Sequence, residues 1–165
     1  MFEPLVDKAL ELGASDAKLI DINQIVFDPR AFLKCRFGCK RWGQYWTCPP
    51  NLSISADKFM LAFQNYEKAI IYKTPNPKFG QEVGLALEKE AMLAHGFYFA
   101  FAMVLCVKCD ECSFPDPCRF PHLARPAMDA YGIDIGKTIE PLGFKLEFDK
   151  EGKLIPAWWG AVLLG

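Results

Sequence analysis

The chain has 165 residues, of which 24% are charged and 52% hydrophobic, a composition typical of a folded protein rather than a disordered one. This length suits a single hydrophobic core, so we expect one domain over residues 1–165. The formal net charge of -1 and the pI near 6.1 provide no global field for a polyanion, which argues against nucleic acid as a partner.

Helical and strand periodicities alternate along the first hundred residues. The stretch 4–13 has apolar residues at helical spacing with Gly13 at its end, and 17–28 alternates apolar and polar residues as a half-buried strand does. Residues 55–66 predict a helix with a serine N-cap. A strand is expected over 68–74, a loop over 75–80 and an amphipathic helix over 81–96.

The second half begins with the most apolar segment of the chain. Residues 97–106 carry no charge and predict a central strand covered on both faces. Residues 107–121 contain three prolines and three cysteines, so regular structure is not expected there. A short helix over 122–134 and a closing hairpin over 143–164, turning near 149–152, complete the pattern. The fold class is therefore α+β, or mixed-sheet α/β, with a central sheet, flanking helices and two cysteine-rich metal loops.

The apolar segment and the N-terminus both bear on localisation. The run 96–106 is about half the roughly 20 residues that a helix needs to cross a bilayer, so no membrane span is expected. The N-terminal sequence "MFEPLVDKALELG" contains acidic residues and lacks a basic start and a small-residue cleavage site. We therefore expect a cytoplasmic protein with no membrane partner, whose seven cysteines stay reduced.

The cysteines fall into two groups. The first consists of Cys35, Cys39 and Cys48, and the second of Cys106, Cys109, Cys112 and Cys118. Two-residue gaps, as in the second group, let a turn present successive sulfurs to one inorganic core and free backbone amides to hydrogen-bond its sulfides. This spacing is close to the bacterial ferredoxin pattern and favours an iron–sulfur cluster of the [4Fe–4S] type.

Other interpretations of the thiols stay open. Free cysteine is often buried, and Cys106, at the end of an apolar stretch, also suits core packing. Zinc is the stronger competitor, because four thiolates, or three thiolates with His122, make a closed tetrahedral site. Zinc modules usually separate two ligand pairs by a dozen or more residues, whereas these thiols are bunched, so iron–sulfur is preferred. His95, at a helix end, is less suited as a ligand.

Seven thiols divide into four and three. The second group can saturate one [4Fe–4S] cluster, and the first would hold another cluster with one iron lacking a cysteine. The rival arrangement is a single cluster or zinc ion shared between the groups. The sequence does not choose between them, because the distance between the groups depends on tertiary structure.

Aromatic, basic and acidic residues accompany the cysteines. Four aromatic residues would exclude water from a cluster or simply pack the first loop: Phe37, Trp42, Tyr45 and Trp46. Five cations would offset thiolate charge or remain solvated: Arg36, Lys40, Arg41, Arg119 and Arg125. Asp129 and Asp134 lie near the second group, where helix capping and turn formation explain both as well as an acid–base role does.

Two stretches resemble a known family. "CKRWGQYWTCPP" and "CVKCDECSFPDPCRFPHLARPAMDAYGIDIGKT" are similar to a prokaryotic family described only as predicted metal-binding proteins of unknown function, with its Cys-Pro-Pro and Pro-Cys-Arg motifs. The similarity spans roughly residues 35 to 140. Ala127 and Asp129 stand where the family pattern has Ser and Glu, which leaves the metal assignment untouched. The resemblance implies bound metal, in the form of an iron–sulfur centre, and supplies no reaction.

Taken together, these patterns predict a protein with one or two [4Fe–4S] clusters that serves electron transfer or redox chemistry and meets a redox partner protein. A zinc-stabilised structural or interaction module is the alternative. A third hypothesis is an enzyme that uses the open iron of a three-cysteine cluster. The sequence contains no phosphate-binding loop, nucleophile elbow or His-Glu-x-x-His helix, so it gives no support to the chemistry of those motifs.

Overall fold

The structure, a computed structural model, describes residues 1–144, 147–153 and 155–165. Within these residues none of the helices is long and apolar enough to cross a membrane. The α-helices are α1 (Glu3–Glu11), α2 (Arg30–Gly38), α3 (Ala56–Phe63), α4 (Pro77–His95) and α5 (Ile135–Ile139). The strands are β1 (Asp16–Asp21), β2 (Lys68–Thr74), β3 (Phe101–Met103) and β4 (Trp158–Leu164). Short 3-10 helices are η1 (Ile22–Gln24), η2 (Met128–Tyr131) and η3 (Glu140–Leu142).

The strands form one sheet in the order β1-β2-β4-β3, and every neighbouring pair is antiparallel. At its centre, β2 and β4 pair along their whole length, from Lys68 opposite Leu164 to Thr74 opposite Trp158. An entirely antiparallel sheet flanked by helices confirms the α+β prediction and is not the mixed sheet given as its alternative.

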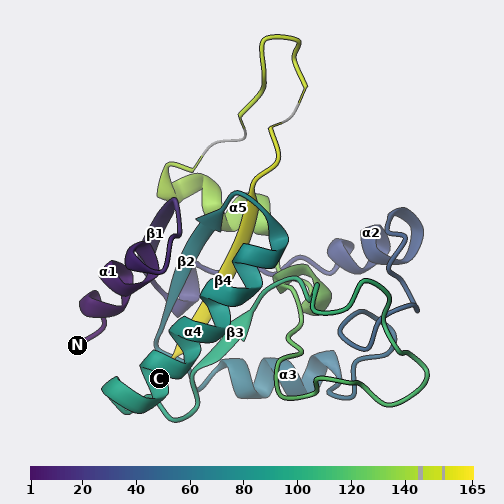
Figure 1. Cartoon of the computed structure of the whole chain (residues 1–165), viewed down its shortest axis with the longest axis horizontal. Coiled ribbons are helices and arrows are strands. Elements are labelled where there is room, and N and C mark those ends of the chain that lie inside the picture. Colours follow the sequence, from purple (N-terminus) through teal and green to yellow (C-terminus); the bar gives the residue numbers. More distant parts are fainter. Residues whose placement is uncertain (145–146, 154) are drawn as a thin grey trace.

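Helices cover both faces of the sheet, and α4 crosses one of them (Figure 1). On that face Leu5 of α1 and Leu87 of α4 belong to one buried cluster with Ile70 of β2. On the opposite face Phe59 of α3 joins a second cluster with Ile71. Adjacent residues of β2 thus point to opposite faces, as the pleat of a strand requires, and both faces are apolar.

Several predicted elements are confirmed. The helix predicted over 4–13, the helix over 55–66 and the strand over 68–74 correspond to α1, α3 and β2. Ser55 is the N-cap of α3, since its side chain accepts a hydrogen bond from the Lys58 backbone N–H at 3.3 Å. The predicted irregular segment also has no regular structure.

The end of β1 and the start of α4 differ from the prediction, and at both places a polar side chain caps a helix. The strand predicted over 17–28 ends at Asp21, because the Asp21 N–H donates to the Gln24 side chain at 2.8 Å and η1 begins there. The loop predicted over 75–80 is wrong from residue 77 onward. The Asn76 side chain accepts from the Phe79 N–H at 2.8 Å and caps α4, which starts at Pro77. Proline is common at the first position of a helix.

The apolar stretch 97–106 is not a central strand. Only Phe101–Met103 pairs with the sheet, and it lies at the edge beside β4. The next residue, Val104, donates its N–H to the Pro126 carbonyl at 2.9 Å. The chain after the second cysteine group therefore covers this sheet edge, while Ala102 and Met103 of β3 are buried in the clusters on the two faces.

The predictions for the last part of the chain, the helix over 122–134 and the closing hairpin, also need correction. The helix predicted over 122–134 is replaced by η2 and, beyond it, α5. The predicted turn near 149–152 is present, because the Gly152 N–H donates to the Asp149 carbonyl at 3.0 Å, and it projects beyond the sheet (Figure 1). The strand leading into the turn falls partly on residues 145 and 146, and the one leaving it includes residue 154, all outside the described residues.

Candidate metal centre

The first cysteine group lies on and after α2, a helix that the sequence analysis missed. Cys35 is in the last turns of α2, Cys39 directly follows the helix, and Cys48 lies in the turns beyond it. The prediction that this whole group is in a loop is therefore wrong for Cys35. All three cysteines line one pocket, and its other lining residues include Arg41, Trp42, Leu105 and Asp129.

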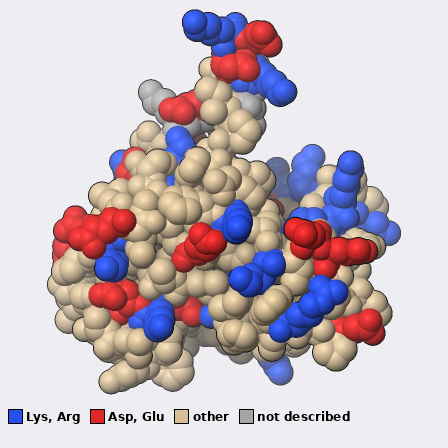
Figure 2. Space-filling view, viewed as in Figure 1, with Lys and Arg blue, Asp and Glu red and all other residues tan. Residues whose placement is uncertain are grey.

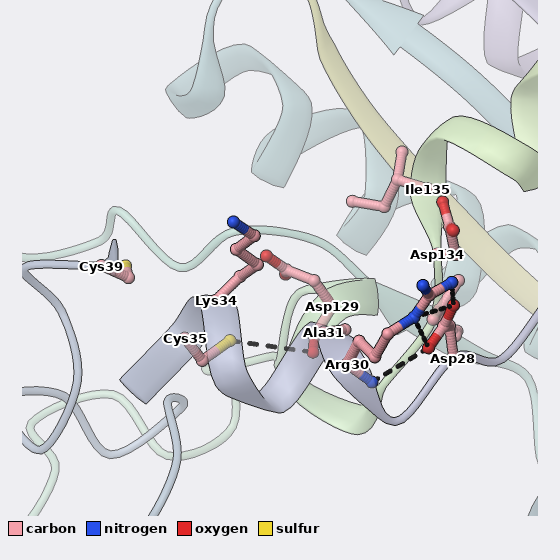
Figure 3. A pocket seen from close by; sticks show the side chains of 10 residues that line it. Asp28, Arg30, Ala31, Lys34, Cys35, Cys39, Asp129, Asp134 and Ile135 are labelled. Atoms are coloured by element: carbon pink, nitrogen blue, oxygen red, sulfur yellow. Dashed lines mark hydrogen bonds and ion pairs between the residues drawn. The ribbon is translucent and has the colours of Figure 1, made fainter. Parts of the chain in front are cut away.

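The packing of α2 on η2 fixes the first thiol. The Cys35 Sγ lies 4.0 Å from the Asp129 carbonyl oxygen, to which it donates (Figure 3). Burial raises the pKa of Cys35 to about 11, and the charge of Asp129 adds to this. Burial also raises the pKa of Cys48, although Arg41 opposes the shift. Metal binding at this pocket must therefore release protons from both thiols.

The second cysteine group lines a different pocket. Its cysteines, Cys106, Cys109, Cys112 and Cys118, share the pocket with Tyr45, Trp46, Thr47, Lys108, Ser113, Phe120 and Ala124. Tyr45 and Trp46 belong to the loop of the first group, yet they close the pocket of the second. The Trp46 Nε1 donates to the Asp116 carbonyl at 2.7 Å, and its ring meets Phe114 edge-on at 4.9 Å. The two cysteine segments are thus packed against each other.

Gln81 of α4 holds the beginning and the end of the second segment together. Its side chain is 4% exposed. The amide nitrogen lies 3.6 Å from the Cys106 Sγ and 3.2 Å from the Leu123 carbonyl, while the amide oxygen accepts from the Val107 N–H at 2.9 Å. Sequence reasoning missed this residue, although Gln81, Gly84 and Glu88 recur at helical spacing on one buried stripe.

Arg41 connects the two groups. Its Nη2 donates to the Cys106 carbonyl at 2.8 Å, its guanidinium lies 3.6 Å from the centre of the Tyr45 ring, and it lines the three-cysteine pocket beside Cys48. Its Nε is buried and has no hydrogen-bond partner among the described residues. A buried donor without an acceptor costs roughly 1–3 kcal/mol. A thiolate or sulfide sulfur in this pocket would supply the acceptor that Nε lacks.

Neither histidine lies at the thiols. His122 is exposed and lines neither cysteine pocket, and His95 is the last residue of α4. The structure thus does not bring His122 together with three cysteines, which was one of the two ligand sets considered for zinc. Of the predicted aromatic residues, Trp42 lines the first pocket, whereas Phe37 is 79% exposed and lines neither.

The remaining predicted cations have separate roles. Arg36 stacks on the rings of Phe37 and Trp42 at 5.1 and 5.6 Å, and Lys40 is exposed. Arg119 donates to the Glu111 carbonyl at 3.0 Å within its own segment. Basic side chains gather over the region of α2 (Figure 2), which contributes Arg30, Lys34 and Arg36. Of the predicted cations, Arg41 is the one that lines a cysteine pocket.

The thiols line these pockets but do not converge on a single metal position. Over the described part of the chain, no three His, Cys, Asp or Glu side chains are placed to hold a single metal ion. A zinc site needs every thiolate within about 2.3 Å of one ion. A cluster distributes its thiolates over several irons and therefore needs a wider ring of ligands.

A further pocket, which is open to solvent, adjoins the three-cysteine pocket (Figure 3). Cys35, Cys39 and Asp129 line both pockets. On its far side Arg30 and Asp28 form a two-pronged ion pair, with Nη2 and Oδ2 2.6 Å apart, and this pair lowers the pKa of Asp28. The three-cysteine pocket therefore shares part of its wall with an open hollow lined by charged side chains.

An α+β fold with seven free cysteines, all of them lining two adjacent pockets, defines a cysteine-rich protein of the metal-binding class. Residues 18–164 match the family described as predicted metal-binding protein (DUF2284), and the chain belongs to that family. The match confirms the resemblance and extends it beyond residues 35 to 140. No curated protein and no solved structure matches the chain.

Proposed function

We propose that the protein carries two [4Fe–4S] clusters, one on each cysteine group, and serves electron transfer. The observation that carries this proposal is the separation of the thiols into two pockets, one lined by four cysteines and one by three. Four thiolates match the ligand requirement of one cubane cluster, and three leave one iron for another ligand. The separation favours two centres over a single shared one.

Hydrogen-bond donors near the sulfurs support the fit. The Gln81 amide already points at the Cys106 Sγ, and the Arg41 Nε is a buried donor with no described acceptor. Donors to thiolate and sulfide sulfurs are a common feature of iron–sulfur sites, and they raise the reduction potential. When bound, such clusters accept and release single electrons, while Tyr45 and Trp46 keep water from the four-cysteine pocket.

Metal and sulfide analysis of the anaerobically purified protein tests this proposal. Two clusters predict about eight iron atoms and about eight acid-labile sulfides per chain, with a broad brown absorption and reversible one-electron reduction. Zinc without sulfide would refute the proposal and support the structural module. About four of each would support one cluster only. Oxygen destroys exposed clusters, so the measurement must precede any exposure to air.

Replacing Arg41 with methionine is expected to lower the reduction potential of the three-cysteine centre. Arg41 lines that pocket together with the three cysteines, and a cationic donor stabilises the more negative, reduced state. The shift should be on the order of tens of millivolts, read from a redox titration followed by EPR.

Arg36→Met is the matched control for this prediction. It removes the same charge from the neighbouring helix, but Arg36 contacts aromatic rings and is exposed. Its effect on either potential should be small because solvent screens exposed charges. Equal shifts in both variants would contradict a specific hydrogen bond from Arg41.

A further inference from the structure

The three-cysteine pocket lacks a fourth thiol, and Asp129 is positioned to replace it. The pocket is lined by Cys35, Cys39 and Cys48 together with the acidic residue Asp129. Building on the two-cluster function, we propose that the Asp129 carboxylate is the fourth protein ligand of the three-cysteine centre, and that small thiols entering from the open pocket displace it.

The surroundings of Asp129 support ligation. Among the residues that line this pocket, the other charged side chain is Arg41, which has only donors and cannot bind a metal. In Figure 3 the Asp129 side chain points towards the side of the view where Lys34 and, farther off, Cys39 lie. Asp129 lines this pocket together with all three thiols, and the Cys35 Sγ lies 4.0 Å from the Asp129 carbonyl oxygen.

Local capping does not fully account for this aspartate. Asp134 is a helix cap, since its Oδ1 accepts from the Lys137 N–H at 2.9 Å at the start of α5. Asp129, by contrast, lies in the first turn of η2, where the N-cap residue Ala127 makes no side-chain hydrogen bond. An ionised carboxylate offers about four lone-pair sites, so the Asp129 carboxylate has the capacity to bind a metal.

The position of Asp129 between two pockets predicts that its ligation is exchangeable. Asp129 lines both the three-cysteine pocket and the open one, and its side chain is exposed at their junction. Carboxylate oxygen is a harder ligand than thiolate and binds iron–sulfur centres less firmly. A small thiolate can therefore take its place on the solvent side without unfolding the protein, and the carboxylate then remains free.

Spectroscopy of the anaerobic holoprotein tests this proposal. Asp129→Cys and Asp129→Asn are compared with the wild type, and Asp134→Asn, a carboxylate of the open pocket outside the three-cysteine pocket, is the control. We expect Asp129→Cys to keep the iron and sulfide content but change the EPR spectrum of one reduced centre only. A large excess of 2-mercaptoethanol should move the wild-type spectrum towards that of Asp129→Cys and leave Asp129→Cys itself unchanged. Asp134→Asn should behave as the wild type does.

The outcomes separate this inference from the proposed function. Wild-type protein without sulfide would overturn both. Two intact clusters with EPR spectra unchanged in both Asp129 variants, or with a wild-type spectrum that does not respond to the thiol, would overturn Asp129 ligation alone. The EPR signal of the four-cysteine centre shows whether each variant is folded. The thiol titration of the wild type tests the proposal even if both Asp129 variants fail to fold.

Discussion

Replacing both Cys109 and Cys112 with alanine is expected to remove about four of about eight iron atoms and leave the three-cysteine centre loaded. The reason is that these cysteines line a pocket to which Cys35, Cys39 and Cys48 do not contribute. Two thiols are removed rather than one, because the first group is proposed to hold a cluster with only three cysteines. A single replacement would leave three cysteines in the second group as well. Iron and sulfide analysis with EPR gives the result.

The reciprocal variant, Cys39→Ala with Cys48→Ala, is the matched control. It should lose the other four irons and keep the EPR signal of the four-cysteine centre. If either double variant empties the protein completely, the thiols serve one shared centre. If neither changes the metal content, the cysteines are not the ligands.

Loss of the four-cysteine centre should also loosen the segment 107–121. Few hydrogen bonds hold its middle part, 108–119: Ser113 to the Pro117 carbonyl at 2.9 Å, Arg119 to the Glu111 carbonyl at 3.0 Å, and Trp46 to the Asp116 carbonyl at 2.7 Å. Structural metal sites contribute on the order of 10 kcal/mol to folding. Trypsin should therefore cut the first double variant after Lys108 and Arg119 much faster than it cuts the reciprocal variant.

Sequence patterns predicted those elements whose own residues determine them. The strand 68–74 was correct to the residue because its apolar run is bounded by a charged residue and by Pro75. The helix 55–66 followed from the Ser55 cap. In contrast, the run 97–106 contains an edge strand of only three residues, because the next residue, Val104, pairs with the Pro126 carbonyl of a segment that covers this edge. Coverage by distant chain cannot be read from local periodicity.

The candidate site, like the fold, was predicted where local sequence determines it and missed where tertiary contacts do. The cysteine spacing predicted two groups of thiols, and each group lines its own pocket. The polar residues between them were missed or assigned no specific partner. Gln81 looks like an ordinary helical residue, and Arg41 one basic residue among several, until tertiary contacts bring each to Cys106. Which aromatic residues close which pocket was likewise undetermined, because Tyr45 and Trp46 cover the group from the other segment.

Replacing Arg125 with leucine is expected to destabilise the protein by about 3–5 kcal/mol, because it leaves a buried carboxylate without its cation. Glu88 of α4 is 7% exposed. Its Oε2 accepts from the Ala102 N–H of β3 at 2.6 Å and from the Arg125 Nε at 2.9 Å. Arg125 also donates to the Ala124 carbonyl at 2.8 Å. The pair thus ties α4 and β3 to the chain that leaves the second cysteine group, and urea unfolding of the metal-free protein measures its contribution.

Two comparisons identify the buried charge as the cause. Adding Glu88→Gln to Arg125→Leu should restore part of the stability, because the amide oxygen still accepts from Ala102 and no charge remains buried. Lys8→Ala, which breaks the exposed pair between Lys8 and Glu11 at 3.5 Å, should cost less than about 1 kcal/mol. If Arg125→Leu costs no more than Lys8→Ala, this pair does not anchor the end of the cysteine segment to the sheet, and the metal-binding segment must be held in place chiefly through Gln81.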